Sequence, residues 1–148
     1  MTSARTSWNA TFYPLWIVYA VVPVAAGIDK FFYLLADWDT YIAPLFARLL
    51  PFDGRTFMLI VGVIEVAVGV AALTRFRRLA AYVAAAWLVC ISINLLIGGF
   101  YDVAVRDLTM AVGAFTLGQM MGLRGEPILG AHREASAGHN ISQISVTA

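Results

Sequence analysis

Residues 79–101 read LAAYVAAAWLVCISINLLIGGFY, and no side chain in this stretch is charged. Residues 6–28 form a second run without a charge. A helix that crosses a lipid bilayer needs about 20 predominantly apolar residues. Both runs are long enough to span a membrane, and together they predict an integral membrane protein.

Two further apolar stretches carry charges. Residues 56–73 contain Glu65, and residues 103–123 contain the neighbouring pair Arg106 and Asp107. An ionised side chain at the centre of a bilayer costs about 2.5–3.5 kcal/mol on insertion scales, so such residues usually pair with one another or take part in function. We predict that these stretches are also spans, and that their charges mark the region of interest.

The composition agrees with a membrane protein, because 61% of the 148 residues are apolar, ten are basic and nine are acidic. A soluble domain of this size needs more charged surface residues. We predict an all-α fold, an integral membrane four-helix bundle that forms one domain over residues 12–122. Residues 1–11 would be a cytoplasmic N-terminus and residues 123–148 a polar, flexible cytoplasmic tail. The four predicted membrane-spanning helices cover residues 12–35, 57–73, 79–99 and 103–122.

The connection between the first and second predicted spans is too long for a simple turn. Its apolar and aromatic residues recur at helical spacing, which predicts a short helix lying in the outer membrane interface. These side chains either anchor the helix in the interface or form a lid over the mouth of the bundle. They are Trp38, Tyr41, Ile42, Leu45, Phe46 and Leu49.

The distribution of arginines predicts the orientation of the chain. Segments that face the cytoplasm carry an excess of basic residues. The N-terminus, the connection between the second and third spans and the tail would lie on the same side, so both termini are predicted to be cytoplasmic. The arginines on that side are Arg5, Arg75, Arg77, Arg78, Arg124 and Arg133, against Arg48, Arg55 and Arg106 on the other.

All four predicted spans carry polar residues at a similar depth in the outer half of the membrane. At 1.5 Å per residue, Glu65 lies about 12 Å from the outer end of its helix. Gly62 and Gly69 share a helix face with Glu65, and small residues also line the face of Asp107, so both acidic side chains should point into the bundle. The candidate site consists of Asp29, Lys30, Glu65, Asn94, Arg106 and Asp107.

Two interpretations of these six residues remain open. In the first, they satisfy one another and fix the order and register of the helices. In the second, they line a polar pocket that opens outward and suits a quinone head group, a proton or a small solute. The contacts expected in the first case are Lys30 with Glu65 or Asp107, Arg106 with Asp102 or Asp29, and hydrogen bonds that bridge through Asn94.

Several chemistries lack the residues that they need. No histidine lies in a predicted span, since His132 and His139 fall in the tail, and Cys90 is the single cysteine. Haem ligation by two histidines, an intrachain disulfide and a thiolate metal site are therefore excluded. The near-neutral net charge gives no indication of nucleic acid binding. We predict no catalytic or metal-binding residue, and a quinone or a lipid at the bundle surface as the remaining bound molecule.

Four short features of the chain occur together. They are Gly27–Phe31 near the end of the first span, Val61–Gly69 in the second, the connection Arg75–Arg78, and Asp107 at the start of the fourth. In this pattern the sequence resembles the DoxX-like family of small four-helix membrane proteins of bacteria and archaea, over residues 12–122. The recurring polar positions of that family match Lys30, Glu65 and Asp107.

The resemblance implies a membrane partner of a redox complex, because the family takes its name from a small subunit associated with quinone-linked sulfur oxidation. We therefore expect a non-catalytic anchor or accessory subunit of a respiratory or other quinone-linked complex in the bacterial inner membrane. Its partners would be the lipid bilayer and the other subunits. One alternative is a quinone-interacting oxidoreductase component in which Glu65 or Asp107 exchanges protons. Another is a small transporter for a solute or a proton.

Overall fold

The computed structural model describes residues 2–129, which form helices and connections and contain no strand. The all-α class is therefore confirmed. Residues 130–148 lie outside the described part of the chain, and with them most of the predicted flexible tail, including His132 and His139. The elements are α1 (Thr2–Phe32), the 3-10 helix η1 (Trp38–Tyr41), α2 (Pro44–Leu49), α3 (Gly54–Ala72), α4 (Arg77–Gly98) and α5 (Tyr101–Leu123).

Three of the helices are long and apolar enough to cross a membrane. They are the part of α1 from Asn9 to Phe32, α3 and α4. This supports the assignment to membrane proteins. Helix α5 has a similar length of 23 residues, but Asp102, Arg106 and Asp107 lie in its first two turns and it is not one of the three. A fourth span at α5 therefore stays a prediction.

Helix α1 differs from its predicted bounds at both ends. It begins at Thr2 instead of residue 12, because the residues before Pro14 include no glycine or proline that would end it. It ends at Phe32 instead of residue 35, where Tyr33 takes a left-handed conformation with a φ of 56°. The Tyr33 amide donates to the Asp29 carbonyl at 2.6 Å. A left-handed residue of this kind closes a helix and redirects the chain.

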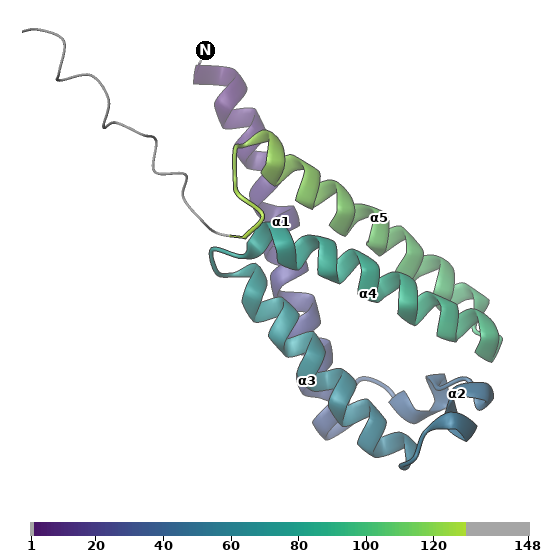
Figure 1. Ribbon diagram of the computed structural model, residues 1–148. Coiled ribbons are helices and arrows are strands. Elements are labelled where there is room, and N and C mark those ends of the chain that lie inside the picture. The colour runs from purple at the N-terminus through teal and green to yellow at the C-terminus, as the bar shows by residue number, and fades with distance from the viewer. Residues whose placement is uncertain (1, 130–148) are drawn as a thin grey trace, which may run out of the picture.

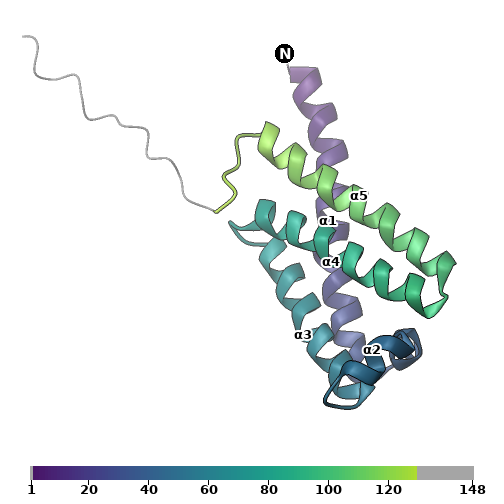
Figure 2. The same ribbon diagram turned by 45° about the vertical axis from the view of Figure 1, so that its right-hand side comes forward.

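The helices pack in two antiparallel pairs, α1 with α3 and α4 with α5. Figures 1 and 2 show that the two pairs diverge toward the end of the molecule that carries η1 and α2. The face of α3 that contains Gly62, Glu65 and Gly69 is buried, as is the face of α5 that contains Asp107 and Ala114. The prediction that both acidic side chains point inward is thus confirmed.

The connection between α1 and α3 contains η1 and α2 in place of one continuous helix. Pro44 occupies the first turn of α2, where a missing N–H costs little. Ile42 packs with Met58 and Val61 of α3, and Trp38 and Phe46 lie against this cluster. The connection therefore covers the diverging ends of the helices, and its position in a membrane interface stays a prediction.

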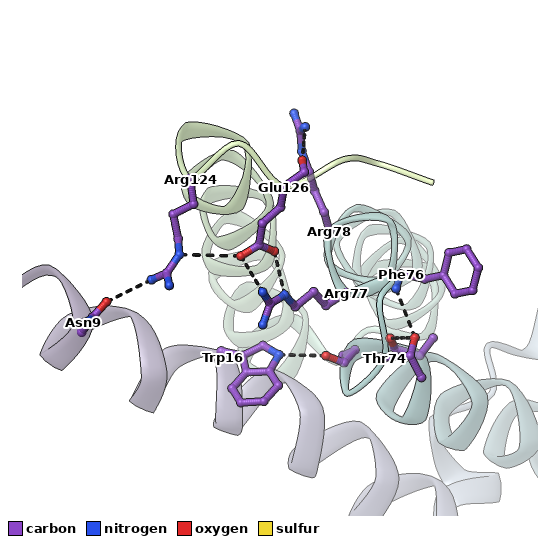
Figure 3. Close-up of polar contacts among 10 residues, drawn as sticks. Asn9, Trp16, Thr74, Phe76, Arg77, Arg78, Arg124 and Glu126 are labelled. Carbon is purple, nitrogen blue, oxygen red and sulfur yellow. Dashed lines mark hydrogen bonds and ion pairs between the residues drawn. The ribbon is translucent and has the colours of Figure 1, made fainter. Parts of the chain in front are cut away.

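The opposite end of the molecule is closed by charged contacts (Figure 3). The Arg77 guanidinium donates to both carboxylate oxygens of Glu126, at 2.7 and 2.8 Å. Arg124 lies 3.6 Å from the same carboxylate and donates to the Asn9 side chain at 3.3 Å. The segment just after α5 is therefore attached to both α1 and the start of α4.

Candidate functional site: a buried ion pair between two helices

The centre of the candidate site is an ion pair between Lys30 and Glu65. Lys30 lies in the last turn of α1 and Glu65 in the middle of α3. The Lys30 Nζ donates to Glu65 Oε2 at 2.6 Å, and the two residues are only 4% and 8% exposed. Of the two partners predicted for Lys30, the structure selects Glu65. Burial of both groups makes this contact costly to break, because the remaining charge would be left without a partner.

Trp38 covers this ion pair from the connection. The Lys30 Nζ lies 3.8 Å from the centroid of the Trp38 ring, a cation–π contact. The Trp38 indole N–H donates to Asp29 Oδ2 at 2.8 Å. Asp29 also accepts from the backbone amides of Leu34 and Leu35, at 3.0 and 3.1 Å. Asp29 therefore holds the turn after α1 and positions Trp38 over Lys30, and it forms no ion pair with Arg106.

Asp107 brings α5 to the same region. Its carboxylate is mostly buried and interacts electrostatically with both Lys30 and Glu65. Arg106 Nε lies 3.3 Å from Asp107 Oδ1, and its side chain is 67% exposed. The predicted pairing of Arg106 with Asp102 or Asp29 is wrong. The side chains of Arg106 and Asp107 contact each other instead, and most of the Arg106 side chain is exposed.

Asn94 bridges by hydrogen bonds, as predicted, but to the backbone of the connection and not to the charged side chains. Its Oδ1 accepts from the Ala43 amide at 3.0 Å, and its Nδ2 donates to the Tyr41 carbonyl at 2.7 Å. Tyr41 is the last residue of η1, and Ala43 directly precedes α2. Asn94 thus attaches the connection to α4 and closes the end of the molecule over the ion pair.

Trp87 is a member of this site that the sequence reasoning missed. It extends from α4 and packs against the cluster of Ile42, Met58 and Val61. Its indole N–H is buried and interacts with the Glu65 carboxylate, but the geometry falls short of a well-formed hydrogen bond. Buried polar groups are rarely left unpaired. The helical spacing of Trp87 and Asn94, seven residues apart on one face of α4, was the available signal.

Tyr33 fixes the connection from its outer side. Its hydroxyl donates to Asp39 Oδ1 at 2.5 Å, and the Arg55 guanidinium lies 4.3 Å from the centroid of its ring. Burial and the hydrogen bond to Asp39 raise the pKa of Tyr33 to about 12. The hydroxyl therefore remains protonated at every physiological pH and continues to donate to Asp39.

Within residues 2–129, no group of three or more histidine, cysteine or acidic side chains is placed to hold a metal ion. The site instead offers the Lys30 cation, the carboxylates of Glu65 and Asp107, and the Trp87 N–H donor, which forms no well-formed hydrogen bond. Such groups can bind the carbonyl or hydroxyl oxygens of a small polar head group, or can act purely as internal packing contacts.

Comparison of the chain with protein-family models, with curated proteins and with solved structures found no match. The resemblance to the DoxX-like family therefore rests on the short sequence features alone.

Proposed function

We propose that the protein is an integral membrane protein of four spans, with α5 as the fourth, and that it is a non-catalytic accessory subunit of a quinone-linked redox complex in the bacterial inner membrane. The observation that carries this proposal is the exposed apolar surface of helices long enough to cross a membrane, and the buried Lys30–Glu65 ion pair at 2.6 Å, enclosed by Trp38, supports a structural role for the polar site. The Glu65 carboxylate is held by the Lys30 ammonium group and is mostly shielded from water, so this ion pair is suited to joining α3 to α1.

The surface of the helices supports a role in assembly. Long stretches of α1 and α5 expose large apolar side chains, which need lipid or another protein to cover them. Examples are Val21, Val105 and Val112, which are 54%, 61% and 67% exposed. Such surfaces supply the contacts that a membrane anchor makes with its neighbouring subunits.

The charged contacts of Figure 3 support the proposed orientation. Asn9, the start of α4 and Arg124 meet at one end of the molecule. The N-terminal part of the chain, the arginine-rich connection and the segment after α5 therefore lie on the same side. An excess of arginine on that side favours the cytoplasm.

The test is purification of the tagged protein from its native host in a mild detergent, followed by identification of the proteins that accompany it. We expect a stoichiometric enzyme with a flavin, an iron–sulfur cluster or a haem. A matched variant, Val112→Arg, places a charge on the exposed face of α5 and should reduce recovery of the partner while the fold is kept. Purification of the wild-type chain alone, as a monodisperse species, would contradict the proposal.

A second candidate function is direct proton exchange with a bound quinol. The Trp87 N–H, which interacts with Glu65 without a well-formed hydrogen bond, favours it together with the nearby Asp107, because a quinone oxygen could accept a better hydrogen bond from that N–H. Glu65→Gln alone leaves Lys30 unpaired, so the double variant Lys30→Met/Glu65→Gln is needed as its control. Loss of quinol turnover in both variants, with assembly intact, supports this function, and normal turnover in the double variant rules it out.

A further inference from the structure

We propose that the groove between α3 and α4, beside Arg75, binds one anionic phospholipid, with an acyl chain in the groove and the head-group phosphate at the arginine. This site is separate from the ion pair, and it does not depend on whether the protein belongs to a redox complex.

The groove is apolar and lies directly against the connection between the two helices. Its walls are the side chains of the last turns of α3, from Ile64 to Ala71, and of the first turns of α4, together with Phe76. Its volume is about 280 Å³. Eight helical residues extend about 12 Å, so the groove follows the helices from the connection toward the middle of the membrane. An acyl chain of a lipid whose head group lies at the connection would take this path.

The positive charge at the mouth of the groove specifies the head group. The Arg75 guanidinium lies 5.0 Å from the centroid of the Phe76 ring, and Phe76 itself lines the groove. Within residues 2–129, Arg75 is exposed and takes part in no ion pair, whereas Arg77 is occupied by Glu126. Figure 3 shows the Phe76 ring pointing away from Glu126, whose carboxylate pairs with Arg77 and Arg124.

Charge and size together favour a lipid over a helix of another protein. Residues 73–78 include Arg75, Arg77 and Arg78 and no acidic residue, and clusters of basic residues beside membrane helices attract anionic lipids. A helix with its side chains is about 10–12 Å across, so one turn of it occupies more volume than a groove of about 280 Å³ and only its side chains could enter. A single flexible hydrocarbon chain fits this space.

Native mass spectrometry of the delipidated protein in detergent tests the site. The probes are equal amounts of phosphatidylglycerol and phosphatidylcholine with identical acyl chains. Arg75→Gln removes the charge from an exposed loop position, and Ala67→Phe fills the groove. The matched controls are Arg55→Gln, an arginine that lies over the Tyr33 ring at the opposite end, and Val63→Phe, which is on α3 at a 57% exposed position outside the groove.

We expect the wild-type protein to retain one phosphatidylglycerol in preference to phosphatidylcholine. Arg75→Gln should reduce this preference roughly fivefold, the contribution of one basic residue near a lipid surface. Ala67→Phe should abolish retention of that lipid, and both controls should behave as the wild type does. Equal retention of the two lipids by the wild type, or unchanged retention by Arg75→Gln and Ala67→Phe, would overturn the proposal.

Discussion

Gly27 of α1 and Gly62 of α3 lie in direct contact, with no room for a side chain between them. A Cβ atom at Gly62 would lie 2.7 Å from the Gly27 carbonyl oxygen and 3.1 Å from Lys30 Cβ. The absence of side chains brings the two helix backbones together at this point. Because α1 and α3 run antiparallel, Lys30 and Glu65 lie one turn from this contact in opposite directions, and their side chains reach back to meet beside it.

We expect Gly62→Ala to destabilise the protein by about 1–3 kcal/mol, because the added methyl group meets backbone that cannot move aside. It should also loosen the Lys30–Glu65 contact. Thermal unfolding in detergent measures the loss. Gly54→Ala is the control, since a Cβ atom there meets side chains and no backbone: the end of Ile42 at 3.0 Å and Asp39 at 3.9 Å. Equal stability of the two variants would contradict this account of the α1–α3 contact.

The ion pair makes a prediction about single and double replacements. Lys30→Met and Glu65→Met each leave one buried group without its partner, and each should cost about 3–5 kcal/mol. The double variant Lys30→Met/Glu65→Met leaves no unpaired charge and should recover most of that loss. Chemical or thermal unfolding of the four proteins in the same detergent gives the comparison. Additive losses in the double variant would show that the two side chains are not coupled.

Asn94 is predicted to hold the connection closed over the ion pair. Asn94→Leu removes the partners of the Ala43 amide and the Tyr41 carbonyl, so hydrogen exchange at residues 38–46 should accelerate roughly five- to thirtyfold, for a loss of about 1–2 kcal/mol. Exchange in the second half of α4 should stay close to that of the wild type. Thr109→Ala serves as the control, because the Thr109 hydroxyl donates within its own helix, to the Val105 carbonyl. Unchanged exchange in Asn94→Leu would refute the proposed attachment.

We predict that the contribution of Asp53 to stability, at the start of α3, depends on pH. The Thr56 hydroxyl donates to Asp53 Oδ1 at 2.7 Å and the Thr56 amide to Oδ2 at 3.2 Å. These hydrogen bonds lower the pKa of Asp53 below its ordinary value of 3.8. Since the folded state favours the carboxylate, this contribution to stability is complete above the ordinary pKa and is lost as the pH falls through the lowered one.

We therefore expect Asp53→Ser, which keeps a neutral cap, to be less stable than the wild type at pH 7 and to approach it below pH 3.8. Thermal unfolding at a series of pH values provides the measurement. A difference between the two proteins that grows as the pH falls would have the wrong sign for this mechanism.

Much of the helical framework could be predicted from the sequence, because long apolar runs and faces of small residues are local patterns. The buried faces of Glu65 and Asp107 followed from their spacing relative to glycine and alanine. The similar depth of the polar residues in the membrane was enough to limit the predicted partner of Lys30 to Glu65 or Asp107. In contrast, the true start of α1 was missed, because Asn9 and Thr11 resemble residues that begin a helix although the helix passes through them.

The contacts that depend on the path of the chain between α1 and α3 could not be predicted. Trp38 reaches Lys30 only because Tyr33 turns the chain with a positive φ, an unusual conformation for a residue with a side chain. The contact of Arg106 with Asp107 depends on side-chain rotamers, which helical spacing does not predict; that spacing pointed instead to Asp102, one turn away. Membership of the DoxX-like family and a role in a redox complex remain proposals.

The turn at Tyr33 has a consequence for how the connection can vary. Asp29 binds the amides of Leu34 and Leu35 and the indole of Trp38, while Tyr33 binds Asp39. The segment of residues 33–39 is therefore held by hydrogen bonds to specific side chains. Loops usually accept insertions and deletions, but one residue gained or lost here would carry the indole away from the ammonium group beneath it. The number of residues between Asp29 and Asp39 is thus strictly constrained.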